Sequence, residues 1–141
     1  MKIARQFHWE MGHRLPFHAG LCKNIHGHSY RMWVELEGAC DDNGMLIDYG
    51  EMKALIQPLI DPLDHCFLSD KDDHVMKAFV ERESFKTLIV PFSTTAENLS
   101  RYMIEKIWRV FDPYRRIVSI TVRIAETENS YAEITRNREG I

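Results

Sequence analysis

Alternating apolar and polar positions predict four β-strands, because successive side chains of a strand point to opposite faces of its sheet. These strands span residues 2–13, 28–37, 118–124 and 131–135. The apolar residues that share one parity within the first three strands are Ile3, Phe7, Trp9, Met11, Tyr30, Met32, Val34, Leu36, Val118, Ile120, Val122 and Ile124. We therefore expect each of these strands to bury one face and expose the other.

Helical periodicity predicts two helices between the second and third strands. The first begins at Asp48, a favoured N-cap residue that is followed three positions later by a glutamate. Pro58 lies inside its apolar stripe, which predicts a kink or an early end. The second helix begins at Thr94 or Thr95 and ends before Pro113.

The resulting element order, ββααββ, predicts an α+β fold: a four-stranded antiparallel sheet with two helices on one face. No repeat, low-complexity stretch or linker divides the chain, so we expect residues 1–141 to form a single domain. Residues 70–93 carry the weakest pattern, and within them residues 85–90 are typical of a short edge strand.

The composition is that of an ordinary globular protein, with 45% hydrophobic and 28% charged residues among 141. A formal net charge of -3 argues against a nucleic-acid partner bound through a basic surface. No apolar run approaches the ~20 residues of a membrane span, and the first residues lack a signal-peptide core. We expect a cytoplasmic protein with no membrane partner. Its three cysteines do not make a disulfide framework.

Three histidines fall where the strand parities converge. His13 continues the apolar parity at the end of the first strand, and His26 and His28 continue that of the second strand at its start. If the two strands pair as a hairpin, all three imidazoles lie on one face at one edge. Each histidine alone is better explained as a hydrogen-bonded, partly buried side chain. Three together favour a zinc site with an open fourth position.

Further candidates for chemistry lie nearby in the sequence. Cys22 stands four residues before His26, in a connection that is long for a hairpin, where a cation favours the reactive thiolate. The alternative is a small buried hydrophobe. Asp64 and His65 follow the first helix and are able to form a proton relay with a reactive cysteine, although such pairs are common by chance.

Glu126 continues the apolar parity of the third strand, which points its carboxylate toward the core. A buried carboxylate needs a partner, and a planar ligand with adjacent N–H donors is a suitable one. The alternative is a salt bridge at the strand end, to Arg123 or Arg136.

These residues stand in motifs that resemble the 6-pyruvoyl-tetrahydropterin synthase family, which includes the bacterial 6-carboxytetrahydropterin synthases of the queuosine pathway. The motifs appear in the family's order and cover the chain from near residue 7 to near residue 134. They are Phe7-His8-Trp9-Glu10-Met11-Gly12-His13-Arg14-Leu15-Pro16, Cys22-Lys23-Asn24-Ile25-His26-Gly27-His28-Ser29, Leu63-Asp64-His65, Thr95-Ala96-Glu97-Asn98 and Glu126-Thr127.

The resemblance implies the tunnelling fold, in which sheets from several subunits close into a barrel and two trimers stack as a homohexamer with active sites between subunits. It also implies the role of each matching residue. His13, His26 and His28 match the zinc ligands, Cys22 matches the catalytic cysteine, and Asp64 and His65 match the catalytic pair. Glu126 matches the carboxylate that anchors the pterin ring, and Thr95, Glu97 and Thr127 fall in stretches that form the pterin pocket.

The implied substrate is 7,8-dihydroneopterin triphosphate, and Lys23 and Arg14 are candidate partners of its phosphates. Two outcomes share such a site. Carbon–carbon cleavage releases acetaldehyde and triphosphate and gives 6-carboxy-tetrahydropterin, whereas triphosphate elimination gives 6-pyruvoyl-tetrahydropterin. Three residues separate Cys22 from His26, and this compact spacing resembles the carboxy-forming enzymes. A third, non-catalytic interpretation is a pterin-binding module with a structural zinc, which would need a fourth protein ligand.

Overall fold

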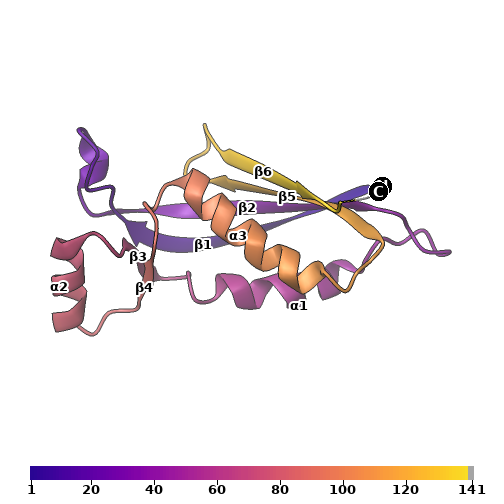
Figure 1. Cartoon of the computed structure of the whole chain (residues 1–141), viewed down its shortest axis with the longest axis horizontal. Helices are drawn as coiled ribbons and strands as arrows, with labels where there is room; N and C mark the ends of the chain where they lie inside the picture. The colour runs from indigo at the N-terminus through magenta and orange to yellow at the C-terminus, as the bar shows by residue number, and fades with distance from the viewer. Residues whose placement is uncertain (140–141) are drawn as a thin grey trace.

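A computed structural model describes residues 1–139, and within them the chain forms one mixed β-sheet with helices packed against it (Figure 1). The elements, in chain order, are β1 (Lys2–His13), the 3₁₀ turn η1 (Leu21–Lys23), β2 (His26–Gly38), α1 (Tyr49–Ile60), β3 (Cys66–Asp70), α2 (His74–Arg82), β4 (Thr87–Val90), α3 (Ala96–Phe111), β5 (Ile117–Ala125) and β6 (Ala132–Asn137). The order of the strands across the sheet is β4-β3-β1-β2-β5-β6.

The four predicted strands form the antiparallel part of this sheet, since β1 pairs with β2, β2 with β5, and β5 with β6. The prediction of a four-stranded sheet in the order ββααββ is nevertheless wrong. Two short strands, β3 and β4, add to the edge of β1 in parallel, and the described part of the chain has three α-helices. With five and four residues, these strands are too short to show a clear alternation.

The helix starts follow the predicted capping chemistry. Asp48 caps α1, with its carboxylate accepting a hydrogen bond from the backbone N–H of Glu51 at 2.9 Å. Thr95, rather than its neighbour Thr94, caps α3. The helix α1 continues past Pro58 to Ile60, so an early end at the proline is not observed.

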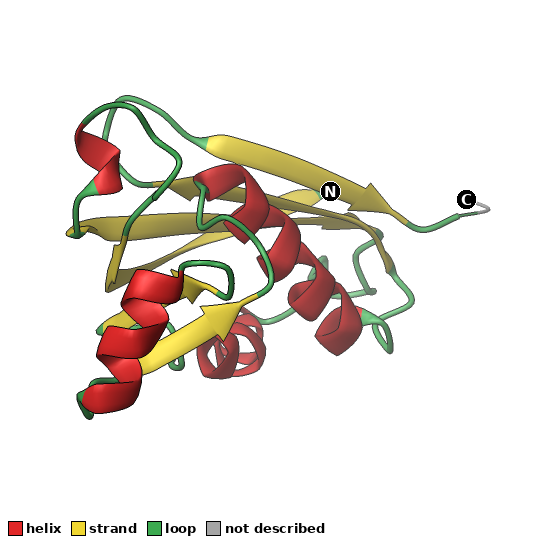
Figure 2. Cartoon of the chain, turned by 60° about the vertical axis from the view of Figure 1, so that its left-hand side comes forward, coloured by secondary structure: helices red, strands yellow, loops and turns green. Residues whose placement is uncertain are grey.

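The segment from residue 70 to residue 93 holds α2 and β4. The helix α2 was not predicted, because it has nine residues and only Met76 among them is buried, so its apolar stripe is too short to recognise. The strand β4 falls within residues 85–90 and lies at the sheet edge, as predicted. Figure 2 shows α2 beside the short strands β3 and β4.

The core lies between one face of the sheet and the helices α1 and α3 (Figure 1). It is built from the predicted apolar parities of β1, β2 and β5 together with one face of each helix, except that at the start of β5 Ile117 is buried and Val118, which was predicted to be, is not. His13, His26 and His28, at the β1–β2 end of the sheet, share the parity of the core residues and therefore lie on the same face of the sheet. Within residues 1–139, no helix has both the length and the apolar character that crossing a membrane requires.

Candidate active site

Three histidine rings meet at the end of the β1–β2 hairpin. In the strand register His13 stands directly opposite His26, and His28 lies opposite Met11, the previous residue of the same parity. The ring centroids are 4.6 Å apart for His13 and His26, 5.1 Å for His13 and His28, and 5.0 Å for His26 and His28. One ligating atom from each lies within 4.8 Å of the others, a spacing at which one cation can be shared.

Hydrogen bonds to backbone carbonyls orient two of the three rings. The Nδ1–H of His13 donates to the carbonyl of Thr94 at 2.8 Å, and that of His26 donates to the carbonyl of Asn24 at 2.7 Å. Because a carbonyl only accepts, Nδ1 carries the proton and Nε2 keeps its lone pair for a ligand. The Nε2 atoms of His13 and His28 face each other at 3.1 Å.

Burial favours the neutral form of His13 and His28, which is the form that binds metals. It lowers the pKa of His13, whose side chain is 1% exposed, to about 4, and it also lowers the pKa of His28. Neutral, correctly oriented imidazoles fit a divalent transition metal such as zinc. In the described part of the chain the cluster contains no fourth ligand, and Cys22 is not a member of it.

Glu126 follows the end of β5 and faces this cluster. Its carboxylate oxygens lie 3.8 Å from Nε2 of His13 and 3.7 Å from Nε2 of His28, and the hydroxyl of the buried Tyr30 donates to it at 3.4 Å. The alternative of a salt bridge to Arg123 or Arg136 is wrong, because those guanidinium groups pair with other carboxylates. Burial raises the pKa of Glu126.

A cavity of about 370 Å³ opens in front of Glu126. Two more predicted substrate-binding residues, Thr95 and Glu97, line it from the start of α3. Thr127 is not among its lining residues and instead contacts the backbone and side chain of the following turn. The other residues that line the cavity are Leu15, Phe17, His18, Ala96, Ile124, Ser130, Tyr131 and Ala132.

Phe17 and His18 were not predicted as cavity residues. They belong to the connection between β1 and β2, which has no periodicity that would reveal where its side chains point. The Nδ1 atom of His18 accepts a hydrogen bond from the N–H of Gly20 at 2.9 Å, which leaves the other ring nitrogen of His18 as a donor.

Cys22 lies in the 3₁₀ turn η1 of the same connection and is half-buried. Its carbonyl accepts a hydrogen bond from the N–H of Leu15 at 2.8 Å, so the two ends of the connection are tied to each other. Cys66, by contrast, is buried in β3, and burial raises the pKa of its thiol to about 11. Only the first of these thiols therefore has the exposure that a reactive cysteine needs.

Asp64 and His65 form a hydrogen-bonded pair just before β3. The Nδ1–H of His65 donates to Asp64 at 2.9 Å, and the backbone N–H of Glu10 donates to the same oxygen at 3.0 Å. The hydrogen bond from Glu10 is the main cause that lowers the pKa of Asp64. His65 has a φ of 59°, a conformation uncommon outside glycine, and its side chain is 76% exposed.

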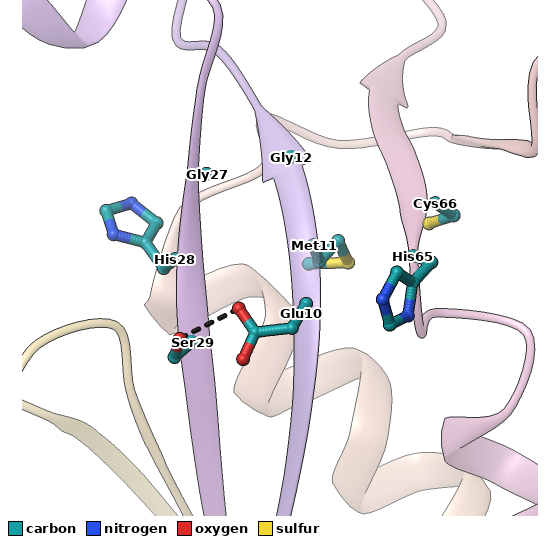
Figure 3. Close-up of a pocket in the computed structure, with 8 residues that line it drawn as sticks. All are labelled: Glu10, Met11, Gly12, Gly27, His28, Ser29, His65 and Cys66. Carbon is teal, nitrogen blue, oxygen red and sulfur yellow. Dashed lines mark hydrogen bonds between the residues drawn. The ribbon is translucent and has the colours of Figure 1, made fainter.

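Within residues 1–139 this pair is neither part of the histidine cluster nor hydrogen-bonded to it. Figure 3 shows His65 beside β3 and His28 on β2, with β1 between them. His65 lines an open depression of about 370 Å³ together with Glu10, Ser29 and His28 of the cluster, and no hydrogen bond in the described part of the chain joins His65 to the three histidines. The pair, just before β3, thus lies across β1 from the two histidines on β2.

Comparison with known proteins agrees with the resemblance. A family model described as 6-pyruvoyl tetrahydropterin synthase matches residues 2–137. A curated 6-carboxy-5,6,7,8-tetrahydropterin synthase of Haemophilus influenzae is 34% identical over 140 residues, covering 94% of this chain and 96% of its own. One of Rickettsia conorii is 27% identical over 137 residues, covering 95% and 99%.

Solved structures agree in fold. A catalytic-residue mutant of Plasmodium vivax 6-pyruvoyltetrahydropterin synthase superposes with a TM-score of 0.79 at 17% identity, covering 98% of both chains. The Caenorhabditis elegans 6-pyruvoyl tetrahydropterin synthase gives 0.68 at 26% identity, covering 99% of this chain and 96% of its own. The chain belongs to the 6-pyruvoyl tetrahydropterin synthase family. The predicted α+β class and the predicted family are confirmed.

Proposed function

We propose that this chain is a zinc-dependent lyase that converts 7,8-dihydroneopterin triphosphate to 6-carboxy-5,6,7,8-tetrahydropterin, with loss of acetaldehyde and triphosphate. The observation that carries the proposal is the position of Glu126, whose carboxylate lies within 4 Å of His13 and His28 and also lines the cavity. A pterin ring that is hydrogen-bonded to this carboxylate would have its side chain close to the metal that the histidines hold. The 6-carboxy names of the curated relatives support the product.

In this proposal His13, His26 and His28 hold the zinc ion. When bound, zinc polarises the oxygens of the substrate side chain and stabilises negative charge on them. The hydrogen bonds from His13 and His26 to backbone carbonyls fix the orientation of both rings and would leave their Nε2 atoms free to bind the ion.

Glu126 binds the pterin ring. A carboxylate offers two acceptor oxygens, which match two adjacent N–H donors of the ring. Thr95 and Glu97 line the wall at the start of α3, and Thr127 holds the turn that follows Glu126. The ring is thereby oriented with its side chain toward the histidines.

Two groups move protons. Cys22, as the thiolate, removes a proton from the side-chain carbon next to the ring. His65 is the second proton carrier, with Asp64 holding its Nδ1–H and leaving Nε2 free to exchange a proton. Because His65 lies apart from the cluster within one chain (Figure 3), a neighbouring subunit supplies it, in a homohexamer built as a dimer of trimers.

A product assay tests this function. The zinc-loaded protein is incubated with 7,8-dihydroneopterin triphosphate, acetaldehyde is trapped in the same vessel, and the pterin is identified by mass spectrometry. Acetaldehyde together with a carboxy-pterin mass is the expected result. A pyruvoyl-pterin mass without acetaldehyde would instead indicate triphosphate elimination, the reaction of a 6-pyruvoyl-tetrahydropterin synthase. The Plasmodium and Caenorhabditis structures carry that name.

The Cys22→Ala variant separates an enzyme from a binding module. We expect it to keep stoichiometric zinc and to lose turnover, because the cysteine lies outside the histidine cluster. Loss of zinc from this variant would instead indicate a structural four-ligand site.

A further inference from the structure

Arg14 directly follows His13 at the end of β1 and forms a two-pronged ion pair with Asp73. The Nε atom of Arg14 lies 2.6 Å from Oδ2 of Asp73, and Nη2 lies 2.7 Å from Oδ1. The side chain of Asp73 is 4% exposed and that of Arg14 is 20% exposed. A paired geometry of this kind fixes both groups in orientation as well as in distance.

Each partner also holds a second element. Asp73 caps α2, because its Oδ1 accepts a hydrogen bond from the N–H of Met76 at 3.3 Å. Arg14 donates from Nη1 to the carbonyl of Lys23 at 3.3 Å. Lys23 is the last residue of η1, the turn that contains Cys22. The guanidinium therefore links the start of α2 to the turn that carries the cysteine.

The backbone of Arg14 is tied to the histidine cluster as well. Its carbonyl accepts a hydrogen bond from the hydroxyl of Thr94 at 3.3 Å, and the carbonyl of Thr94 is the partner of the His13 ring. The guanidinium donors at Nε, Nη1 and Nη2 are directed at protein acceptors. Three of the five N–H groups of the guanidinium are thereby used within the protein.

We propose that Arg14 and Asp73 are positioning residues, which together clamp the turn η1 and so hold Cys22 in a fixed place in the connection between His13 and His26. The inference rests on the proposed function in so far as Cys22 is the proton acceptor. Asp73 belongs to the segment between residues 70 and 93, to which the family motifs assign no role. The clamp would give α2 a function in the active site although it contributes no residue to the cavity lined by Glu126.

The test compares Asp73→Asn with a matched control. Asparagine caps a helix as well as aspartate does, so α2 is retained while the charge that holds Arg14 is removed. In Asp112→Asn the same exchange breaks an ion pair with Arg138, 2.9 Å long, at the far end of α3. Hydrogen exchange of residues 15–25, zinc content, kcat and KM are measured for both variants and for wild type.

We expect residues 15–25 of Asp73→Asn to exchange their amide hydrogens faster than in wild type, while the variant keeps its zinc. Its kcat should fall about 10- to 100-fold with KM within about threefold, because a small displacement of a reacting group is enough for such a loss. Asp73→Glu, which keeps the charge, should recover part of the loss. Asp112→Asn should match wild type in all four measurements.

Unchanged exchange in residues 15–25 of Asp73→Asn would overturn the clamp. Faster exchange with an unchanged kcat would overturn its positioning role. If the wild-type protein forms no pterin product, the proposed function fails, but faster exchange in Asp73→Asn still supports the clamp and unchanged exchange still overturns it. Melting temperatures of the variants identify any general loss of folding.

Discussion

Glu126 shows how one residue can be unfavourable for folding and still suit a binding site. Its carboxylate is largely withdrawn from water, and no lysine or arginine is paired with it among the ion pairs of residues 1–139. The hydroxyl of Tyr30 gives it one long hydrogen bond. A ligand with two N–H groups would supply the hydrogen-bond donors that this buried carboxylate needs.

The stability of the metal-free protein should reflect this. Burial raises the pKa of Glu126 above the ordinary value of 4.5. A carboxyl group with a raised folded-state pKa stabilises the fold below its unfolded pKa, and this contribution is lost as the pH rises through the folded-state value. We therefore expect Glu126→Gln to gain stability relative to wild type as the pH rises from 4.5 to 7. Urea unfolding in the presence of a chelator measures this, and a constant difference across that range would contradict the prediction.

The same substitution should weaken binding of the pterin. Glutamine offers one acceptor oxygen where glutamate offers two, and it carries no charge. We expect the affinity for dihydroneopterin to fall about 10- to 100-fold, as is typical when a charged hydrogen-bond acceptor is removed. Titration calorimetry of the zinc-loaded protein measures the change, and an unchanged affinity would show that Glu126 does not hold the ring.

The three histidines should couple metal binding to stability. A ligand present at about 100 times its dissociation constant stabilises a folded protein by about 2.7 kcal/mol. Addition of a chelator should therefore lower the melting temperature of the zinc-loaded protein. His26→Ala removes one ligand, and its melting temperature should respond little to the chelator. An equal response in both proteins would place the metal elsewhere.

Two helix caps provide a comparison at the level of elements. Asp48 caps α1 away from the cavity, whereas Thr95 caps α3 and also lines the cavity. Replacement of either by alanine should lower the free energy of unfolding by about 1 kcal/mol. Only Thr95→Ala should raise KM, because Thr95 also lines the cavity that the proposed function assigns to the substrate. A raised KM in Asp48→Ala would show that helix stability alone controls binding.

The long strands, the helices α1 and α3 and the edge strand β4 were predicted, whereas β3 and α2 were not. Strand parity is enough to place His13, His26 and His28 on one face, because a hairpin with one buried face allows a single register. It also points Glu126 toward the same edge. Parity carries no information on irregular backbone, so the positions of Phe17 and His18 at the cavity could not be predicted.

Long-range contacts were beyond what local patterns show. Arg14 and Asp73 are 59 positions apart, and nothing in either neighbourhood indicates that they pair. The parallel strands β3 and β4 join the sheet through contacts of the same kind. Asp64 and His65 were predicted as a pair from adjacency and family resemblance, but the resemblance says nothing of how this chain separates them from its own histidine cluster.

This separation leads to a prediction for the whole molecule. If the site combines Cys22 of one subunit with His65 of a neighbour, Cys22→Ala and His65→Ala homo-oligomers should both be inactive. After the two variants are dissociated and reassembled in equal amounts, about a quarter of the sites should contain both intact residues, if subunits assort at random in a closed ring. About a quarter of the wild-type kcat should therefore return.

The control mixes Cys22→Ala with Glu126→Gln. Glu126 lies within 4 Å of the ring nitrogens of its own chain's His13 and His28, and the connection that carries Cys22 starts directly after that same His13. Each active site would then have two halves: one subunit supplies the metal-binding histidines, Cys22 and Glu126, and its neighbour supplies His65. Both substitutions should therefore affect the half-site that holds the metal. Every such half-site in the mixture is defective, so this pair should stay inactive. Recovery in both mixtures would mean that ring and metal are held by different subunits. Recovery in neither mixture would mean that His65 acts at the histidine cluster of its own chain. The exposed segment before β3 would then have to move across β1.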